Sequence, residues 1–520
     1  MEGEDEGDNL LRRLRMSYRA DFNLPPPPSF KIDYRDEPPG FSEDLSMLEY
    51  KDILTECIDS DPTKDRWGRE RPAKSDWPGT YRSKRVILTL EPLTDVAQIE
   101  RRQNAIRYFA RCHQEGNTAV VRAMRHMLAH HSQMYDDFTS DTRKPESMLS
   151  VVHRFSEFAR AASVLEHELA KSEVMQSFAE ALAGLYEQDH APIMWKARNF
   201  DKRDGRMVLR DYHAYNGMTS LKNAGALELG IYEVEKKSIL YTGEDTDLGN
   251  IGELVLHVAP LVYTLGCFFY QGKVLHNRTK WELPVCLPEI NDEGFFQIKD
   301  AEPAASNVEV PVRFDFSYDR EDNKILLSGA HSGGKTELLL NLFLIHVNAL
   351  AGNILFCNDG QVPIIDHWVS RFSKGKREGA GSLEGEVYEV SADIKTFGRR
   401  TIAFVDEFLD TTKPEIADHI EEPLLGRMEE TEATIILVSH RAAALADDIG
   451  FRFMYPELRE IEVPVRERIY DEYQGFHYWI DTDKKRKRLR PTRKFLTGKP
   501  PAEETARHAQ EMWQDMKEEN

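Results

Sequence analysis

The stretch Ile325-Leu-Leu-Ser-Gly-Ala-His-Ser-Gly-Gly-Lys-Thr-Glu337 decides the fold of the C-terminal half of the chain. Its three leading apolar residues predict a buried strand, and an apolar helix is expected from Glu337 to Ala351, ending at Gly352. The loop between them fits the pattern G-x-x-x-x-G-K-[ST], in the order strand, loop, helix that a phosphate-binding loop requires. The sequence therefore predicts a nucleotide-binding site.

The residue types of this loop have chemical reasons to be there. Glycines let backbone N–H groups close around phosphate oxygens, and the N-terminus of the helix adds a partial positive charge. Lys335 can reach the β- and γ-phosphates, and the Thr336 hydroxyl can bind Mg²⁺. The residues expected to contact the nucleotide in this loop are Gly329, Ser332, Gly333, Gly334, Lys335 and Thr336.

Two further motifs place polar residues after buried strands. In Thr401-Ile-Ala-Phe-Val-Asp-Glu407, two carboxylates follow an apolar run and are expected at the C-terminal end of a strand, beside the phosphates. Asp406 would hold Mg²⁺ and Glu407 would orient or deprotonate the attacking water. A strand from Thr434 to Ser439 ends before His440, which can contact the γ-phosphate.

Composition bounds the class of protein. Hydrophobic residues make up 41% and charged residues 30% of 520 residues, which is typical of a globular chain of several domains. The N-terminus is acidic where a signal peptide needs basic residues, and the apolar runs are too short or interrupted to span a bilayer, so no membrane association is expected. Five scattered cysteines without C-x-x-C spacing favour a reducing compartment.

The net charge of −21 argues against indiscriminate nucleic-acid binding, so any phosphate contact must come from a local basic patch. The clearest patch is Lys484-Lys-Arg-Lys-Arg-Leu-Arg490, continued by Arg493 and Lys494, and a second basic stretch covers 196–210. The first patch is interpreted as a phosphate contact or a nuclear import signal. A solvated basic face that balances acidic neighbours is the alternative.

The chain is predicted to be multidomain, with a largely α-helical part followed by an α/β part. Residues 1–45 are expected to be a disordered acidic and proline-rich tail, 46–284 helical, 285–465 α/β, and 466–520 a basic and helical extension. A helix from Val96 is expected to be capped by Thr94 or Asp95. Asp204-Gly205 is a hairpin-type turn signal, and strands are expected over Val308–Phe316 and Asn353–Cys357.

With these motifs in order, the chain resembles the MutS family of DNA mismatch-repair ATPases, in the ABC-type branch of P-loop NTPases. Gly329–Thr336 stands where that family has G-P-N-M-G-G-K-[ST], and Gln361-Val-Pro363 resembles its F-V-P-A segment, which adds Gln361 to the expected nucleotide contacts. Gly381-Ser-Leu-Glu-Gly-Glu-Val-Tyr-Glu389 resembles G-S-T-F-x-x-E-M. The resemblance implies that Ser382 contacts the γ-phosphate bound by a partner subunit.

The resemblance extends upstream. Leu90-Glu-Pro-Leu-Thr-Asp95 and Ile99-Glu-Arg-Arg-Gln-Asn-Ala-Ile106 are similar to P-L-x-D and I-x-x-R-x-x-A-V at the start of the family's core lever domain. There are departures. Ala330-His331-Ser332 replaces Pro-Asn-Met, and Phe408–Lys413 replaces a glycine-rich segment. Phe41-Ser-Glu43 fits the mismatch wedge motif, but such a short motif arises by chance and intercalation needs a rigid domain behind it. A truncated form of the family that lacks the mismatch-reading N-terminal domain is expected.

The resemblance implies a homodimer that closes on two ATP molecules with Mg²⁺, hydrolyses ATP through Glu407, and passes the change along helical levers to double-stranded DNA. Repair or recombination on mismatched or branched DNA is the expected role. The alternative is a ribosome-associated ATPase in translation quality control, and a non-hydrolysing structural dimer is disfavoured by the intact set of motif residues. The expected location is cytoplasmic, or nuclear in a eukaryote.

Overall fold

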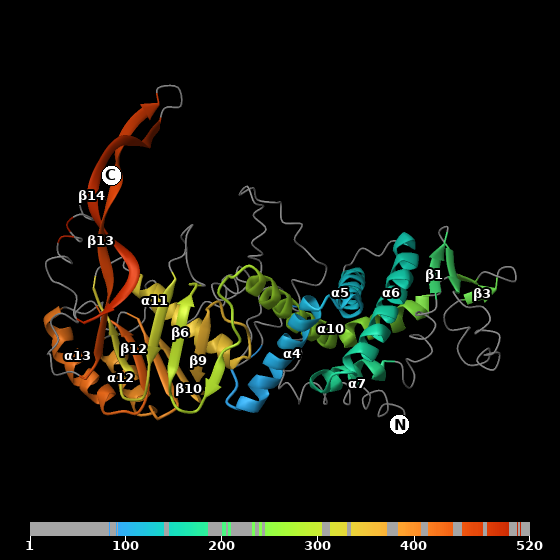
Figure 1. Ribbon diagram of the computed structural model, residues 1–520, viewed down its shortest axis with the longest axis horizontal. Coiled ribbons are helices and arrows are strands. Elements are labelled where there is room, and N and C mark those ends of the chain that lie inside the picture. Colours follow the sequence, from blue (N-terminus) through green and yellow to red (C-terminus); the bar gives the residue numbers. More distant parts are fainter. Residues whose placement is uncertain are drawn as a thin grey trace. The chain divides into compact units, whose positions relative to one another are not determined.

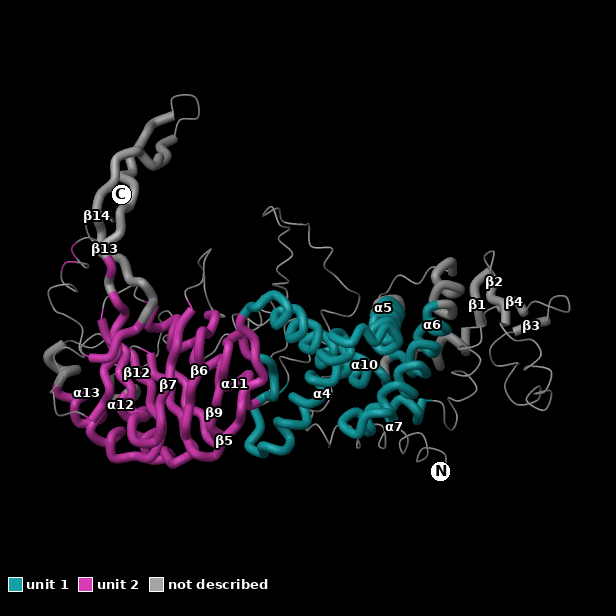
Figure 2. Tube along the Cα trace, viewed as in Figure 1, with its two compact units in different colours: residues 1–39, 54–283, 351–354 teal, residues 40–53, 284–350, 355–520 magenta. Residues whose placement is uncertain are grey.

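The chain divides into two compact units, each with its own core (Figure 2). Unit 1 includes Leu54–Leu283 and Ala351–Ile354. Unit 2 includes Pro284–Leu350 and Leu355–Asn520. The computed structural model describes residues 83, 90, 92–139, 145–185, 200–203, 206–209, 231–233, 239–241, 245–303, 313–329, 334–371, 383–406, 414–439, 450–471, 476–498, 507 and 510.

Unit 1 is built mainly from helices (Figure 1). They are α4 (Val96–Gln114), α5 (Thr118–Thr139), α6 (Pro145–Leu169), the 3-10 turn η1 (Glu173–Met175), α7 (Gln176–Gly184) and α10 (Asp245–Lys280). Two antiparallel strand pairs complete it, β1 (Phe200–Arg203) with β2 (Arg206–Leu209) and β3 (Ile231–Glu233) with β4 (Ile239–Tyr241).

Local signals in the sequence set several of these boundaries. The Asp95 carboxylate accepts a hydrogen bond from the Ala97 N–H at 2.8 Å, so Asp95 and not Thr94 caps α4. Strands β1 and β2 pair with Arg203 opposite Arg206, which confirms the hairpin predicted at that turn signal. Ile99 and Phe109 are fully buried on the predicted apolar face of α4.

Helices α4 and α10 approach each other closely because α10 presents glycine there. A Cβ added at Gly272 would lie 2.8 Å from the Ala110 nitrogen and 2.9 Å from the Ile106 carbonyl oxygen. Helix α10 continues through Pro260. Among the described residues, no helix combines the length and apolar character needed to cross a membrane.

Unit 2 contains two sheets. The six-stranded sheet has the order β10-β11-β12-β8-β13-β14 and the four-stranded sheet the order β5-β9-β6-β7. The strands are β5 (Glu289–Asn291), β6 (Phe296–Ala301), β7 (Phe314–Tyr318), β8 (Lys324–Leu327), β9 (Asp359–Pro363), β10 (His367–Arg371), β11 (Thr401–Val405), β12 (Thr434–Val438), β13 (Arg452–Asp471) and β14 (Phe476–Thr497). The helices are α11 (Lys335–Leu350), α12 (Leu383–Ile394) and α13 (Pro414–Glu429).

Helix α11 packs between these sheets (Figure 1), which explains why it is apolar on nearly every side. Its Phe343 meets Phe404 of β11 edge-on at 5.4 Å, and its His346 stacks on Phe296 of β6 at 4.2 Å between ring centroids. Helices α12 and α13 cover the other face of the six-stranded sheet, where Val390 and Leu425 join Ala403 in one apolar cluster. The central strands β11 and β12 are therefore buried on both faces.

Two sequence predictions in unit 2 need correction. The strand expected over Asn353–Cys357 lies instead at Asp359–Pro363, because Asn353 accepts a hydrogen bond from Gln271 and Leu355 forms only an isolated bridge with Cys286. The strand expected over Val308–Phe316 is confirmed from Phe314 and continues to Tyr318, while 308–312 lie outside the described residues. The helical extension expected after 465 is also wrong as far as Thr497.

The region after 465 is a long antiparallel hairpin, since β13 runs across the predicted boundary and pairs with β14. Arg507 and Gln510 are helical. Rows of β-branched and aromatic residues favour strands here, and the register places Glu462 opposite Lys487. The expected tail over 1–45, including Phe41-Ser-Glu43, lies outside the described residues.

Candidate nucleotide site

The parallel strands of the six-stranded sheet bring the separate motifs to one edge. Strands β8, β12 and β11 are parallel neighbours in that order, so their C-terminal ends lie together. The phosphate loop follows β8, Asp406 follows β11, and Ser439 follows β12. Ligands of α/β sheets bind outside the carboxyl ends of the strands, so the sheet positions these groups for a common ligand.

The loop geometry requires glycine at its two ends. Gly329 has φ 109° and Gly334 has φ 79°, both in the left-handed region that other residues rarely adopt. Helix α11 then begins at Lys335, with the Leu338 N–H donating to the Gly334 carbonyl at 2.8 Å. The start of this helix provides the partial positive charge and backbone donors that bind anions.

Lys335 is buried, at 5% relative exposure, although it carries a cationic side chain. Its Nζ donates to the Gly329 carbonyl oxygen at 3.0 Å, across the mouth of the loop. A buried ammonium group is costly unless it is paired with acceptors. Phosphate oxygens would be stronger acceptors than a carbonyl, so the position suits a lysine that binds an anion at this loop.

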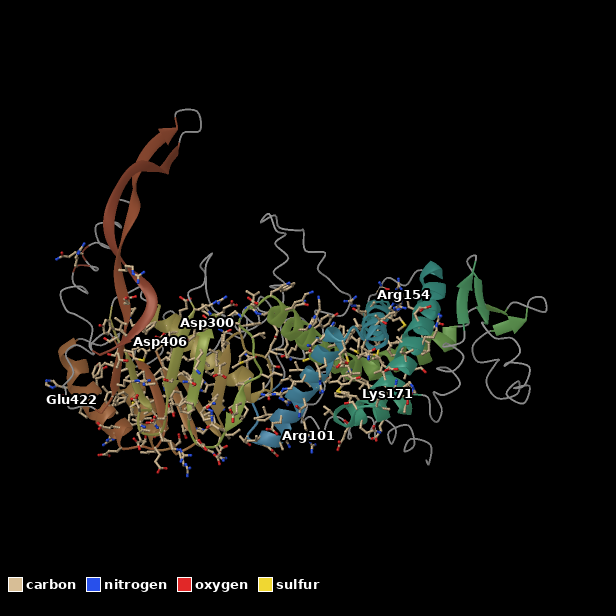
Figure 3. The ribbon with its side chains drawn as sticks, viewed as in Figure 1. Arg101, Arg154, Lys171, Asp300, Asp406 and Glu422 are labelled. Atoms are coloured by element: carbon tan, nitrogen blue, oxygen red, sulfur yellow. The ribbon has the colours of Figure 1, made fainter. Side chains whose placement is uncertain are left out.

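The Thr336 hydroxyl lies 3.1 Å from Oδ1 of Asp406, although the two residues are 70 positions apart. Asp406 is 5% exposed, and its backbone N–H donates to the Arg371 carbonyl at 2.7 Å, which holds it at the end of β11 (Figure 3). A hydroxyl and a carboxylate oxygen are the hard ligands that Mg²⁺ prefers. The residues present therefore fit a magnesium ion beside the phosphates.

Other predicted site residues are not brought into this cluster by the described contacts. Gln361 lies on β9 of the four-stranded sheet, where its side-chain nitrogen donates to Glu289 at 3.3 Å. Ser332, Gly333, Ser382, Glu407 and His440 lie outside the described residues and stay predictions. Next to His440, the Ser439 hydroxyl donates to a buried carboxylate oxygen of Glu421 at 2.7 Å, a contact that the sequence did not predict.

Like the contact between Ser439 and Glu421, the role of Arg102 was not predicted from the sequence. It occupies the arginine position of the I-x-x-R pattern on α4, it is fully buried, and its Nη1 donates to the Ala351 carbonyl at 2.8 Å. The carbonyls at the end of a helix have no partner within it, so Arg102 satisfies one that follows α11. A single arginine among the apolar positions of a helix was the only signal for this role.

A hollow of about 540 Å³ lies at the opposite edge of the six-stranded sheet, where β10 and β11 begin. It is lined by Asp292, Asp366, His367, Gly398, Arg399, Arg400 and Thr401. Arg400 is already paired with Asp292 at 2.6 Å and with Asp366 at 3.4 Å. Acidic groups thus engage that cation, and none of the described loop residues Gly329, Gly334, Lys335 and Thr336 lines the hollow.

Comparison with known proteins gives one partial relative and no family match. No protein-family model matches the chain. Over 173 residues the chain is 31% identical to the DNA-binding protein MutS2 of Pyrococcus furiosus. That stretch is 32% of this chain and covers 30% of the relative, so less than a third of the relative's length is matched. The similarity points to a relationship with the MutS family.

Proposed function

We propose that this protein is a MutS-like, ATP-hydrolysing, DNA-binding protein that works as a dimer. The observation that carries the proposal is the contact between Thr336 and Asp406 at 3.1 Å, next to Lys335 at the start of α11. Together these residues form the donor set of a phosphate-loop site, with oxygen ligands for a divalent ion. The partial similarity to a DNA-binding MutS2 protein supports the choice of family.

The proposed roles divide binding from hydrolysis. Lys335 and the loop N–H groups bind the β- and γ-phosphates, while Thr336 and Asp406 would hold Mg²⁺, which when bound neutralises charge on the phosphates. Glu407 orients and deprotonates the attacking water, and His440 contacts the γ-phosphate. Ser382 of one chain completes the site of its partner, so that ATP binding closes the dimer and hydrolysis opens it. Gln361 and the loop residues Ser332 and Gly333 are the remaining proposed nucleotide contacts.

The roles of two residues can be separated by substitution. Lys335→Ala should weaken ATP binding at least tenfold, because it removes the cation facing the phosphates. Glu407→Gln should bind ATP normally but lower kcat by about 100-fold or more, which is the usual contribution of a general base. Nucleotide affinity by fluorescence titration and phosphate release under saturating ATP measure the two effects.

Glu432→Gln is the matched control, because Glu432 is exposed at the opposite end of β12. It should leave both quantities unchanged. Equal turnover by wild type and Glu407→Gln would remove Glu407 from the mechanism. Unchanged ATP affinity in Lys335→Ala would contradict the assignment of the nucleotide site itself.

The basic strand β14 is the best candidate for the DNA contact. Arg486, Arg488 and Arg490 alternate along it, and the register places Val463, Ile461 and Arg459 opposite them. Residues two apart share one face of a strand, at a spacing of about 7 Å. In the register no acid stands opposite Arg486, Arg488 or Arg490, whereas Lys487 stands opposite Glu462, and Arg459 lies 3.8 Å from Glu457 on its own strand. A local positive face allows phosphate binding despite a net charge of −21.

Replacing Arg486, Arg488 and Arg490 together by serine should weaken DNA binding and reduce the slope of log affinity against log salt by about 3, roughly one per lost phosphate contact. Replacing Lys485 and Lys487 by serine is the control on the opposite face. Binding and ATPase stimulation are compared with branched DNA, homoduplex DNA and ribosomes at several salt concentrations. If ribosomes stimulate the ATPase activity and neither DNA does, the role in translation replaces the role on DNA. The location we propose is cytoplasmic, or nuclear in a eukaryote.

A further inference from the structure

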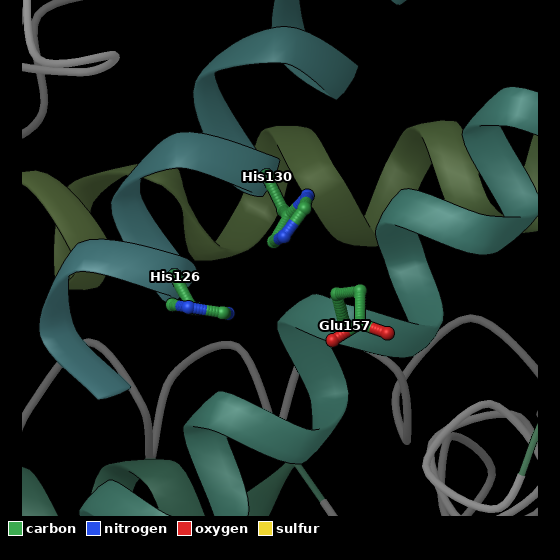
Figure 4. Close-up of side chains that lie close together, drawn as sticks. All are labelled: His126, His130 and Glu157. Atoms are coloured by element: carbon green, nitrogen blue, oxygen red, sulfur yellow. The ribbon is translucent and has the colours of Figure 1, made fainter. Parts of the chain in front are cut away.

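Two histidines on α5 and a glutamate on α6 form a cluster outside the nucleotide site and in the other unit. His126 and His130 are four residues apart, so they share one face of their helix. Figure 4 shows both rings with the Glu157 carboxylate beside them, reaching from α6. One nitrogen of each ring and one oxygen of Glu157 all lie within 4.8 Å of one another.

The donor chemistry selects a class of ligand. Imidazole nitrogens suit zinc and related divalent transition ions, and a pair of histidines at i and i+4 with one carboxylate is a set of three ligands that zinc accepts. Ligand atoms around a tetrahedral zinc ion lie roughly 3.3 Å apart, given metal–ligand distances of about 2.0–2.1 Å. The cluster therefore needs only a side-chain adjustment, which the long Glu157 side chain can provide, to close around an ion.

The surroundings of the cluster also suit an exchangeable ion. His126 is exposed, while His130 and Glu157 are half-buried, so one side of the cluster is open to water. Water can then occupy the fourth position that a site with three protein ligands leaves open. The two ring centroids are 5.8 Å apart with the planes inclined at 63°, so the rings are not stacked face to face.

One neighbour competes with a metal for the carboxylate. Arg160, one turn along α6, forms an ion pair with Oε1 of Glu157 and also reaches the Ser156 carbonyl. A purely structural reading of the cluster is this ion pair with two histidines beside it. The two readings differ in what Arg160 does: in the structural reading it only pairs with Glu157, whereas in a metal site it holds the third ligand until an ion displaces it.

We propose that His126, His130 and Glu157 bind a divalent transition metal ion, with zinc the best fit, and that the ion joins α5 to α6. Because the ligands come from two helices, binding would stabilise the packing of this pair and raise the melting temperature of unit 1. The site is separate from the magnesium ligands proposed in unit 2 and does not depend on ATP hydrolysis.

The test uses the full chain, stripped of metal with a chelator and kept in excess Mg²⁺ so that the nucleotide site does not take up zinc. Zinc affinity is measured by competition with a chromophoric chelator, and thermal unfolding is followed with and without zinc. Wild type should bind zinc in the micromolar range or tighter and melt at a higher temperature with zinc. His126→Ala and His130→Ala should each weaken the zinc affinity at least tenfold and abolish the thermal shift.

Two further variants distinguish a metal site from a merely structural cluster. Arg160→Gln should tighten zinc binding, because it releases the Glu157 carboxylate, although it removes an ion pair from the metal-free protein. His167→Ala is the matched control, an exposed histidine on the same helix outside the cluster, and should behave as wild type. Zinc affinity that is equal in wild type and in the His126→Ala/His130→Ala double variant would overturn the proposal, as would a weaker affinity in Arg160→Gln.

Discussion

At the scale of single residues, burial determines what the polar groups of unit 2 can do. His346 of α11 is fully buried, with Nδ1 donating to the Leu342 carbonyl at 2.7 Å and Nε2 accepting from the Tyr318 hydroxyl at 2.8 Å. Both bonds require the neutral ring with its proton on Nδ1. Burial lowers the pKa of His346 from 6.5 to about 4, because the charged ring would lose its hydration.

The depressed pKa predicts an acid-dependent loss of stability. Between pH 6.5 and about pH 4, His346 is protonated in the unfolded chain but neutral in the folded protein. The free energy of unfolding therefore falls as the pH drops through this window. The loss of unfolding free energy due to His346 is about 3 kcal/mol at most, and no loss occurs above pH 6.5. Urea unfolding of wild type and His346→Gln between pH 7 and pH 4 measures it, and the variant should lose less stability on acidification.

His419→Gln is the control for that experiment, because His419 is exposed on α13. Burial also lowers the pKa of His113 in unit 1 to about 4, so wild type retains some acid dependence from that ring. The quantity to compare is therefore the difference between wild type and His346→Gln in the slope of unfolding free energy against pH. Parallel curves for wild type and His346→Gln would show that the buried ring accepts a proton at no cost.

At the scale of elements, close approach of helices depends on residues without side chains. Gly272 of α10 faces the backbone of α4, and a methyl group there would meet the Ala110 nitrogen and the Ile106 carbonyl below ordinary contact distance. Since backbone atoms of a buried helix cannot move independently, the helices must separate to admit it.

Gly272→Ala should therefore lower the free energy of unfolding by about 1–3 kcal/mol, which is the usual cost of overpacking a core. Gly426→Ala on α13 is the matched control, because an added Cβ there meets no atom within 4 Å. That substitution should be neutral or stabilising by up to about 1 kcal/mol, since alanine favours helices. Chemical denaturation gives both values, and equal effects at the two sites would refute the close packing of α4 against α10.

At the scale of the whole molecule, the proposed mechanism needs a second copy of the chain. In the proposed mechanism, Lys335, Thr336 and Asp406 would bind one nucleotide, and the resemblance assigns Ser382 to the nucleotide of the partner. A site shared between subunits couples the state of the nucleotide to assembly, because ATP then contributes to the free energy of the interface.

The Glu407→Gln variant should accordingly become dimeric when ATP and Mg²⁺ are added and stay so, because hydrolysis no longer opens it. Adding Ser382→Glu should prevent this dimer while leaving ATP affinity within about twofold, since the new carboxylate repels the γ-phosphate of the partner's nucleotide. Light scattering after gel filtration reports the mass. A monomer under saturating ATP, or a dimer that ignores both nucleotide and Ser382→Glu, would contradict the shared site.

The sequence by itself determined those features that depend on neighbouring residues. The strand, glycine loop and helix around Lys335, the capped start of α4 at Asp95, and the buried strands before Asp406 and His440 all follow from periodicity, caps and turn residues within a few positions. These signals act through local backbone preferences, so they can be read without knowing what packs against them.

Only the tertiary structure decided which distant groups meet. Thr336 and Asp406 lie 70 residues apart, and the free thiols of Cys286 and Cys357, scattered in sequence, have sulfur atoms 3.3 Å apart. The pairing of β14 with β13, which replaces the helix expected after 465, likewise depends on a partner strand that supplies its hydrogen bonds. A strand or a site formed from several segments is stabilised by contacts between them, and those contacts exist only once the sheets have assembled.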